Sequence, residues 1–242
     1  MKLRTNLIQT ILQWNERVFF YTKLKAFYRK HLVNDNLTIV DVGSNKGQSI
    51  DFFLSLNPKC KIHGFEPNVE LYRKLISKYS SKPQIEIYNE GVSSKSGKLL
   101  FHENIMNETS SFESLNYESK YLKRKAQILG VPVKNIIAKS YEVDVIALST
   151  FFMNHPSIFV DVLKIDVEGH EYDCLLGLFQ NKQKAYPIKF LQIENHNDDM
   201  YLHNNKDAMI QELLKANGFE EMHKIKHAFG DFYEIIYLNT RL

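Results

Sequence analysis

Two stretches of the sequence carry residue types that suit a nucleotide-like cofactor. Residues 37–48 form an apolar run that reaches Asp41 and continues into the loop Gly-Ser-Asn-Lys-Gly, and residues 61–67 form a second apolar run that ends on Glu66. The loop glycines permit backbone angles and a close approach to the main chain that a Cβ would prevent. A carboxylate at the end of the second strand can accept hydrogen bonds from both hydroxyls of a ribose. The two stretches therefore predict the first half of a nucleotide-cofactor site.

The loop chemistry favours one kind of cofactor over another. NAD-binding folds carry G-x-G-x-x-G and place the pyrophosphate at a helix N-terminus. The loop that begins at Gly43 lacks the G-x-G step, and Asp41 stands just before it, where it would repel a pyrophosphate. S-adenosylmethionine carries an ammonium and a sulfonium, so a carboxylate suits it. Taken alone, Asp41 and Gly43 also fit an ordinary strand-to-helix turn with a capping Ser or Asn.

Acidic residues follow two later strands. An apolar strand delivers Asp166 to its carboxyl end, and Glu168 comes two residues later in the loop. Two such acids repel each other unless a cation or a shared proton lies nearby. The next apolar strand ends at Ile193 and is followed by Glu194 and His196. These residues predict a second, reactive half of the site.

The pattern of apolar runs predicts the elements that position these residues. We expect strands near 37–42, 60–65, 84–88, 160–165, 188–193, 219–225 and 232–238, and helices near 47–56, 68–79, 170–180 and 205–217. Strands separated by helices indicate parallel strand–helix–strand units. The short connection 226–231 cannot hold a crossover, so the last two strands should pair as an antiparallel hairpin. The acids would then project from one edge of the sheet.

Residues 1–33 are predicted to be helical, with a broad apolar face and a basic opposite face. We favour a helical layer packed on the sheet or on a second subunit, with a solvated basic face. The alternative is a peripheral contact with an anionic membrane surface.

The segment 93–150 interrupts the alternation of strands and helices. Accessory strands are expected at 98–103 and 141–146, with a polar segment at 104–115 and a basic helix at 117–129 between them. Gly130 and a following proline end that helix. The inserted segment is placed where a lid or an acceptor-binding element would lie, and a solvated surface helix is an equally good interpretation.

The composition fits a chain that folds around a full core. The 242 residues carry a net charge of +3, which is too mild to indicate nucleic acid. The two cysteines do not make a disulfide framework and favour a reducing compartment. The sequence shows neither a run long enough to span a membrane nor a signal peptide. We therefore expect a cytoplasmic protein with a helical extension at 1–36 and a main domain at 37–242, the latter with an insertion at about 104–140.

Four motifs together resemble the FkbM-type S-adenosylmethionine-dependent methyltransferases. They are Asp-Val-Gly-Ser-Asn-Lys-Gly at 41–47, Phe-Glu-Pro at 65–67, Lys-Ile-Asp-Val-Glu-Gly-His-Glu at 164–171 and Ile-Glu-Asn-His at 193–196. The resemblance implies an α/β, Rossmann-like class I methyltransferase fold, a seven-stranded mostly parallel sheet with a C-terminal antiparallel hairpin. It also implies O-methylation of a sugar, glycan or related natural-product hydroxyl.

The resemblance assigns residues to the cofactor. They are Asp41, Gly43, Ser44, Asn45, Gly47 and Gln48 in the first loop, Glu66, Pro67 and Asn68 after the second strand, Glu90 and Gly91 beside the adenine, and Asp166 at the centre of the site. The chain departs from the family where the usual Thr-Leu-Asp is replaced by Ala-Leu-Ser at 147–149. Residues 1–36 and the insertion lie outside the shared motifs, so the acceptor is the least transferable expectation.

The expected reaction is in-line methyl transfer, with catalytic residues drawn from His196, Asp166, Glu194 and Glu168. A sugar hydroxyl benefits from a general base, and His196 is the best candidate by intrinsic pKa, followed by Asp166 or Glu194. Alternatively, Asp166, Glu194 and His196 hold Mg²⁺ or a similar ion that lowers the pKa of the acceptor hydroxyl. The sequence does not separate these schemes.

Two other functions are compatible with parts of this pattern. An NAD-dependent oxidoreductase would use Glu66 on the ribose, but the missing G-x-G and the lack of an obvious Tyr-x-x-x-Lys pair disfavour it. A non-catalytic module in glycan or natural-product biosynthesis would not need the acidic sheet edge. The expected partner is a hydroxyl-bearing small molecule or glycan and not nucleic acid. The N-terminal helices offer a contact for a membrane surface or a second copy of the chain.

Overall fold

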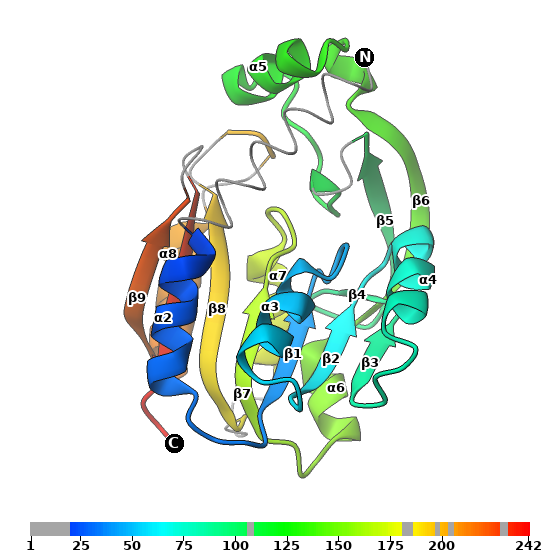
Figure 1. Cartoon of the computed structure of the whole chain (residues 1–242). Helices are drawn as coiled ribbons and strands as arrows, with labels where there is room; N and C mark the ends of the chain where they lie inside the picture. The colour runs from blue at the N-terminus through cyan, green and yellow to red at the C-terminus, as the bar shows by residue number, and fades with distance from the viewer. Residues whose placement is uncertain (1–19, 106–108, 181–185, 197–198, 203–205, 228–231) are drawn as a thin grey trace.

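The computed structural model describes residues 20–105, 109–180, 186–196, 199–202, 206–227 and 232–242. Its centre is a seven-stranded sheet in the order β3-β2-β1-β7-β8-β10-β9 (Figure 1). The strands are β1 (Thr38–Val42), β2 (Lys61–Phe65), β3 (Ile85–Tyr88), β7 (Val160–Ile165), β8 (Ile188–His196), β9 (Phe219–Lys226) and β10 (Phe232–Asn239). The order reverses direction at β1, so the ends of β1 and β7 lie side by side at a point where open α/β sheets bind ligands.

The pairing agrees with the predicted topology. Strands β3, β2, β1, β7 and β8 run parallel, whereas β10 is antiparallel to both β8 and β9. The strand predicted at 188–193 was too short, because β8 continues to His196. Its last residues pair with β10, in the register Glu194 to Glu234 and His196 to Phe232. The antiparallel neighbour keeps this part of the backbone hydrogen-bonded, so Glu194 and His196 belong to the strand and not to the following loop.

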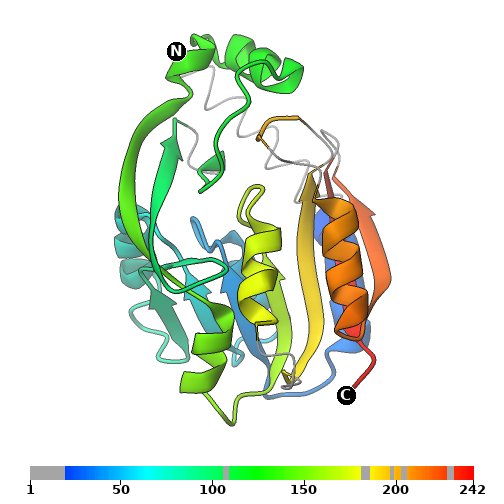
Figure 2. The same cartoon turned by 180° about the vertical axis from the view of Figure 1, so that it is seen from behind.

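Helices cover both faces of the sheet (Figures 1 and 2). The helices are α2 (Tyr21–His31), α3 (Gln48–Leu56) and α4 (Val69–Lys78) on one face, and α6 (Leu148–Asn154), α7 (Glu171–Leu178) and α8 (Asp207–Ala216) on the other. Side chains alternate between the faces, so that Ile39 packs under α2 and α3 while Val40 packs under α6 and α7. Two apolar cores result, one on each side of the sheet.

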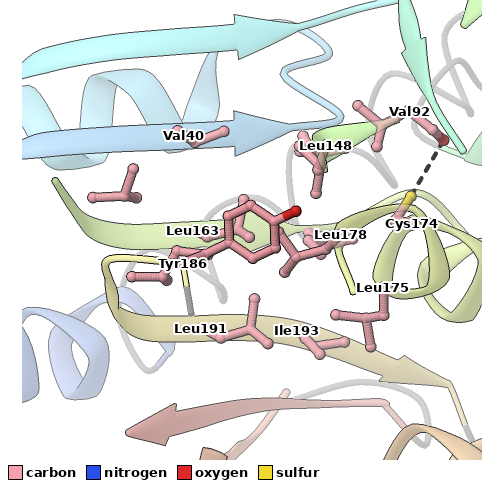
Figure 3. Close-up of a cluster of buried hydrophobic side chains, with 14 of the residues drawn as sticks. Val40, Val92, Leu148, Leu163, Cys174, Leu175, Leu178, Tyr186, Leu191 and Ile193 are labelled. Carbon is pink, nitrogen blue, oxygen red and sulfur yellow. Dashed lines mark hydrogen bonds between the residues drawn. The ribbon is translucent and has the colours of Figure 1, made fainter. Parts of the chain in front are cut away.

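The core under α6, α7 and α8 also contains a free cysteine. Leu175 and Leu178 of α7 pack on Leu191 and Ile193 of β8 (Figure 3). Cys174 lies beside them, with its thiol donating to the carbonyl of Val92 at 3.3 Å. Cys60 is also buried, and neither thiol is in a disulfide. Helix α6 was not predicted from the sequence, where its seven residues follow an apolar strand without a turn signal between them.

The helix predicted at 1–33 is observed as α2 where the structure describes it, and its first nineteen residues lie outside the described range. Leu24, Phe27 and Tyr28 are buried against β8 and β10, in one core with Phe190 and Ile236. This part of the helix is therefore a layer on the sheet. Within the described ranges, none of the helices has the length and apolar character that crossing a membrane requires.

The segment between β3 and β7 forms a smaller sheet in the order β4-β6-β5. It consists of β4 (Gly91–Val92), β5 (Gly97–Asn104) and β6 (Ile137–Ile146), with α5 (Lys120–Leu129) and the short helix η3 (Val133–Asn135) between β5 and β6. The accessory strands are longer than predicted because β5 and β6 pair along nearly their whole length. Helix α5 packs with Met200 and Tyr201, which follow β8. The insertion thereby contacts the strand end that carries the predicted reactive residues.

Candidate active site

The glycine loop after β1 lies against two neighbouring strand ends. The amides of Gly43 and Ser44 both donate to the carbonyl of Phe65, at 3.1 and 2.9 Å. Gly43 has a φ of +87°, and a Cβ built on it would lie 1.9 Å from the carbonyl oxygen of Asp166. Only glycine combines this backbone angle with such close contact. The loop therefore passes directly over the end of β7.

Glu66 is buried at the end of β2 and is held by two backbone amides. Its Oε2 accepts from the amide of Asn45 at 2.7 Å, and its Oε1 accepts from the amide of Asn68 at 2.8 Å. Burial raises the pKa of Glu66 to about 7, although both amide hydrogen bonds oppose the rise. A carboxylate oxygen can accept two hydrogen bonds, so each oxygen retains one acceptor position. Two free acceptor positions side by side match the two hydroxyls of a ribose.

Asn68 supplies a further group to the same place. Its Oδ1 accepts from the amides of Glu70 and Leu71 and caps α4. Its Nδ2 is buried and has no hydrogen-bond partner among the residues that the structure describes. Because an unsatisfied buried donor is costly, this amide is a group that a ligand would satisfy.

These residues line a cavity of about 220 Å³ between the strand ends, α2 and the insertion. Of the residues predicted to bind the cofactor, the cavity wall includes Gly43, Ser44, Asn45, Gln48, Glu66, Pro67, Asn68, Gly91 and Asp166. Asp41, Gly47 and Glu90 are described residues that lie outside this wall. Of the predicted catalytic residues, Glu168 and Glu194 line it together with Asp166. The predicted cofactor half and reactive half therefore share one cavity.

Asp41 lies beneath the loop, next to β7. It is fully buried, and its carboxylate makes no hydrogen bond of standard geometry to the described residues. It is paired in register with Lys164 of β7. Burial raises the pKa of Asp41, whereas Lys164 and the hydroxyls of Ser44 and Ser49 lower it. The structure thus places Asp41 where it acts on Lys164 and the loop.

The acidic edge contains three carboxylates and one lysine. One oxygen each of Asp166, Glu168 and Glu194 lies within 4.8 Å of the others. Lys164 Nζ lies 2.6 Å from Asp166 Oδ2, and the hydroxyl of Tyr201 donates to Glu168 Oε2 at 3.1 Å. Burial and the neighbouring Glu194 raise the pKa of Asp166 well above its usual range, and Lys164 opposes this rise. The protonation of Asp166 therefore depends on the charges of Glu194 and Lys164.

A chain of buried polar groups extends this edge away from the loop. Tyr28 donates its hydroxyl hydrogen to Gln192 Oε1 at 2.5 Å, and Gln192 Nε2 donates to Glu234 Oε2 at 3.0 Å. Burial opposes the charge of Lys164, but the carboxylates of Asp166 and Glu234 raise its pKa well above the usual value. The polar side chains at 192 and 234 interrupt otherwise apolar strands, which is the sequence signal that could have identified them.

A histidine that sequence reasoning did not select lies on the cavity wall. His227, which follows β9, has its Nε2 3.7 Å from Glu194 Oε1 and its ring stacked on Phe20 at 4.2 Å between centroids. Both His227 and Phe20 line the cavity. His196 is the last residue of β8, and its side chain lies outside what the structure describes. Strand β10 pairs with β8 on one side and with β9 on the other, and this arrangement brings His227 close to Glu194. The spacing of the two residues in the sequence gives no sign of this contact.

Helix α2 and the insertion complete the wall. Phe20, Tyr21 and Leu24 of the N-terminal segment and Ser110, Ser111 and Phe112 of the insertion line the cavity. Glu113 fixes this part of the insertion, since its Oε1 lies 2.9 Å from His170 Nδ1 and 3.2 Å from Lys206 Nζ. The segments outside the shared motifs therefore contribute directly to the site.

Fold and site together define a class I S-adenosylmethionine-dependent methyltransferase. The seven-stranded sheet with its antiparallel β10, the glycine loop after β1 and the carboxylate after β2 are the features of that class. Residues 41–221 match the methyltransferase FkbM domain. The chain belongs to the FkbM methyltransferase family. Membership of this family indicates S-adenosylmethionine, and not NAD, as the cofactor.

Three solved structures are similar to this chain. The magnesium protoporphyrin IX methyltransferase of Synechocystis PCC 6803, solved with bound S-adenosylmethionine, matches with a TM-score of 0.50 and 13% identity over 93% of this chain and 81% of that one. A methyltransferase from Aquifex aeolicus matches with a TM-score of 0.48 and 12% identity over 98% of both chains. TrmK of M. capricolum, in complex with S-adenosyl-homocysteine, matches with a TM-score of 0.47 and 11% identity over 89% of this chain and 67% of that one. A search of curated proteins finds no match.

Proposed function

We propose that this methyltransferase acts on a hydroxyl oxygen of a sugar, a glycan or a related natural product. The observation that carries the proposal is the Glu194–His227 pair, with 3.7 Å between carboxylate and imidazole, on the wall of the cavity that also contains Glu66. A hydroxyl is a weak nucleophile at neutral pH and needs a base in the transition state. Transfer to an already deprotonated or strongly nucleophilic acceptor would not need such a pair.

The residues divide into a binding half and a reactive half. Glu66 accepts the ribose hydroxyls, and Asn68 Nδ2 donates to the adenosine part of the cofactor. The bound cofactor supplies an electrophilic methyl group on a sulfonium. Gly43 lets the loop lie against the backbone of Asp166, and the loop would hold the cofactor at this end of the sheet. The walls from α2 and the insertion exclude water and orient the acceptor, and alignment of this kind contributes about 7–11 kcal/mol in favourable cases.

His227 is the base that we propose for the reactive half. Glu194 Oε1 orients the imidazole and stabilises the imidazolium that forms when His227 takes the hydroxyl proton. Asp166, with its raised pKa, is the second candidate. The sequence-based candidate His196 lies two residues after Glu194, at the C-terminal end of β8. It is tested alongside His227.

The cavity wall also indicates the charge of the acceptor. Among the described residues, five carboxylates line it, those of Glu66, Asp166, Glu168, Glu194 and Glu234, against one lysine and one histidine. Such a wall repels phosphates and uronates and accepts hydrogen bonds from hydroxyl or ammonium groups. The rings of Phe20 and Phe52 offer flat apolar surfaces on the same wall. These features support a neutral, polyhydroxylated or amine-bearing acceptor.

A cation-assisted version of the reaction uses the same carboxylates. Asp166, Glu168 and Glu194 form an oxygen-rich set that suits Mg²⁺. We favour proton transfer without a metal, because Lys164 already places a positive charge 2.6 Å from Asp166. Activity that survives exhaustive treatment with EDTA supports this version. Activity that is lost on chelation and restored by Mg²⁺ alone would establish the metal version instead.

The proposal is tested by turnover. The protein is incubated with S-adenosylmethionine and pools of neutral, amine-bearing and anionic glycans, and products are analysed by mass spectrometry for an added methyl group. We expect methylation in the neutral or amine-bearing pools, and fragmentation should place the methyl on oxygen. Methylation at nitrogen or carbon, or activity confined to the anionic pool, would contradict the proposal.

A further inference from the structure

One cluster away from the cofactor cavity combines two histidines and a carboxylate. A nitrogen of His63, an oxygen of Glu86 and a nitrogen of His155 all lie within 4.8 Å of one another. His63 in β2 and Glu86 in β3 are direct cross-strand neighbours, and His155 follows α6. Three separate elements therefore deliver potential metal ligands to one point.

His155 is already oriented as a ligand. Its Nδ1 lies 2.9 Å from the carbonyl oxygen of Phe151, one turn earlier in α6. Because a carbonyl can only accept, Nδ1 carries the hydrogen, and Nε2 of the neutral ring keeps its lone pair. Metal-binding histidines are generally held in this way, by a carbonyl or carboxylate on the other ring nitrogen.

His63 and Glu86 are held by a shared tyrosine. His63 Nδ1 lies 3.1 Å from Glu86 Oε2 and 3.2 Å from the hydroxyl of Tyr88, which donates to Glu86 Oε2 at 2.7 Å. These contacts place a nitrogen of His63 and an oxygen of Glu86 side by side at the proposed metal position.

A second cluster of potential ligands already contains its own cation. Glu113, His170 and Asp173 also lie within ligand distance of one another, but Lys206 Nζ sits 3.2 Å from Glu113 and 3.0 Å from Asp173 and supplies the positive charge. Among the described residues, Glu86 has no ion pair with a lysine or an arginine. Its carboxylate is therefore available to a cation.

We propose that His63, Glu86 and His155 bind a zinc-like divalent transition-metal ion. Two imidazole nitrogens and one carboxylate oxygen are a common zinc ligand set that leaves a fourth position for water or another ligand. A groove of about 460 Å³ lies beside the cluster and is lined by His63 and His155 together with Thr38, Lys61 and Asp161. The groove provides the space for that fourth ligand.

The proposed metal site would be separate from the reaction. The groove contacts the first residues of β1 and β2, Thr38 and Lys61, whereas the cofactor cavity lies beyond the carboxyl ends of these strands. Figure 1 shows α6 at the end of the sheet opposite the insertion. A bound ion would join β2 and β3 to the end of α6.

The test uses the full chain, stripped of metal with a chelator and dialysed. Zinc is titrated calorimetrically, and Co²⁺ is titrated while its visible absorption is followed. We expect a saturable site whose affinity falls at least about tenfold in His63→Ala and in His155→Ala. His102→Ala is the matched control, because His102 is hydrogen-bonded to Ser140 in the smaller sheet, and it should bind as the wild type does. Zinc should raise the melting temperature of the wild type and of the control only.

Circular dichroism without metal establishes that each variant is folded. If an alanine variant does not fold, Glu86→Gln decides, since Glu86 is largely exposed and its replacement removes the charge with little change in packing. The proposal would be overturned if the wild type did not bind zinc. It would also be overturned if His63→Ala, His155→Ala and Glu86→Gln bound zinc as tightly as the wild type does. The latter result would assign the ion to one of the other acidic clusters.

Discussion

Lys164 Nζ lies 2.6 Å from Asp166 Oδ2, and the two residues stand two positions apart at the end of β7. Because side chains alternate along a strand, this spacing puts both on the same face of the sheet. The lysine side chain is only 8% exposed and sits among the carboxylates of Asp166, Glu234 and Asp41. The strand that presents the acidic edge to the cavity thus also carries the cation that balances it.

Replacement of Lys164 should be costly for stability. Lys164→Met keeps the length of the side chain but leaves several buried carboxylates without their cation, and breaking a buried pair in this way typically costs about 3–5 kcal/mol. Urea unfolding at pH 7.5 measures the effect. Lys98→Met is the control, because Lys98 is exposed and lies 3.9 Å from Asp144 at the surface. Equal stability of the two variants would show that the acidic edge does not depend on Lys164.

Binding of S-adenosylmethionine should depend on the protonation of Glu66. Its pKa of about 7 in the free protein means that the carboxyl is largely neutral below pH 7 and loses acceptor capacity for the ribose hydroxyls. Affinity should therefore rise as the pH increases from 6 to 8. Glu66→Gln should bind about 10–100-fold more weakly at pH 8, since hydrogen bonds to a charged group contribute about 1.5–3 kcal/mol each.

Calorimetric titration at several pH values checks this expectation. The Glu66→Gln variant should also lose most of the pH dependence between pH 6 and 8, because the titrating group is gone. Glu70→Gln, in the exposed first turn of α4, should match the wild type. A pH dependence retained in Glu66→Gln would point to another group.

Two histidine variants separate the candidate bases. His227→Ala should reduce turnover by about 10²–10⁴-fold, the usual contribution of a positioned base, with the affinity for S-adenosylmethionine changed little. His196→Ala is the parallel test of the sequence-based candidate, and the larger loss of turnover identifies the base. His223→Ala serves as the control, because His223 is an exposed residue of β9 that stacks on Phe27 and does not line the cavity. A loss of cofactor binding equal to the loss of turnover would contradict a base assignment for the variant concerned.

Two glycines with similar backbone angles separate steric clash from backbone strain. Gly43 has a φ of +87° and Gly130 a φ of +71°, but a Cβ meets the Asp166 carbonyl at 1.9 Å in the first case, and nothing described lies within 4 Å of it in the second. Gly130→Ala should therefore cost only about 1–2 kcal/mol of stability, the penalty of a left-handed residue. Gly43→Ala should cost clearly more and weaken cofactor binding as well. Thermal unfolding and calorimetry measure both effects, and equal costs would mean that the loop moves freely away from β7.

Much of the cavity wall could be predicted from the sequence, because its signals are local. Gly43, Glu66 and Asp166 each stand where an apolar run ends, and parallel strands bring their carboxyl ends to one edge of the sheet. The sequence did not show that Asp41 lies outside the cavity wall and in register with Lys164, because the neighbouring strand β7 is more than a hundred residues away in the chain. Neither residue spacing nor composition indicates which residues so far apart in the chain become neighbours.

The sequence by itself determined the family, the fold and the strand ends that meet at the cavity, because short motifs and the alternation of strands with helices depend on neighbouring residues. Only the tertiary structure decided which side chains complete the cavity wall. The pairing of β10 with β8 brings Glu234 and His227 to Glu194, and the packing of α2 on the sheet brings Phe20 onto His227. These contacts join segments that are distant in the chain, and they arise from the burial of apolar faces, which fixes side-chain neighbours only after the sheet has formed.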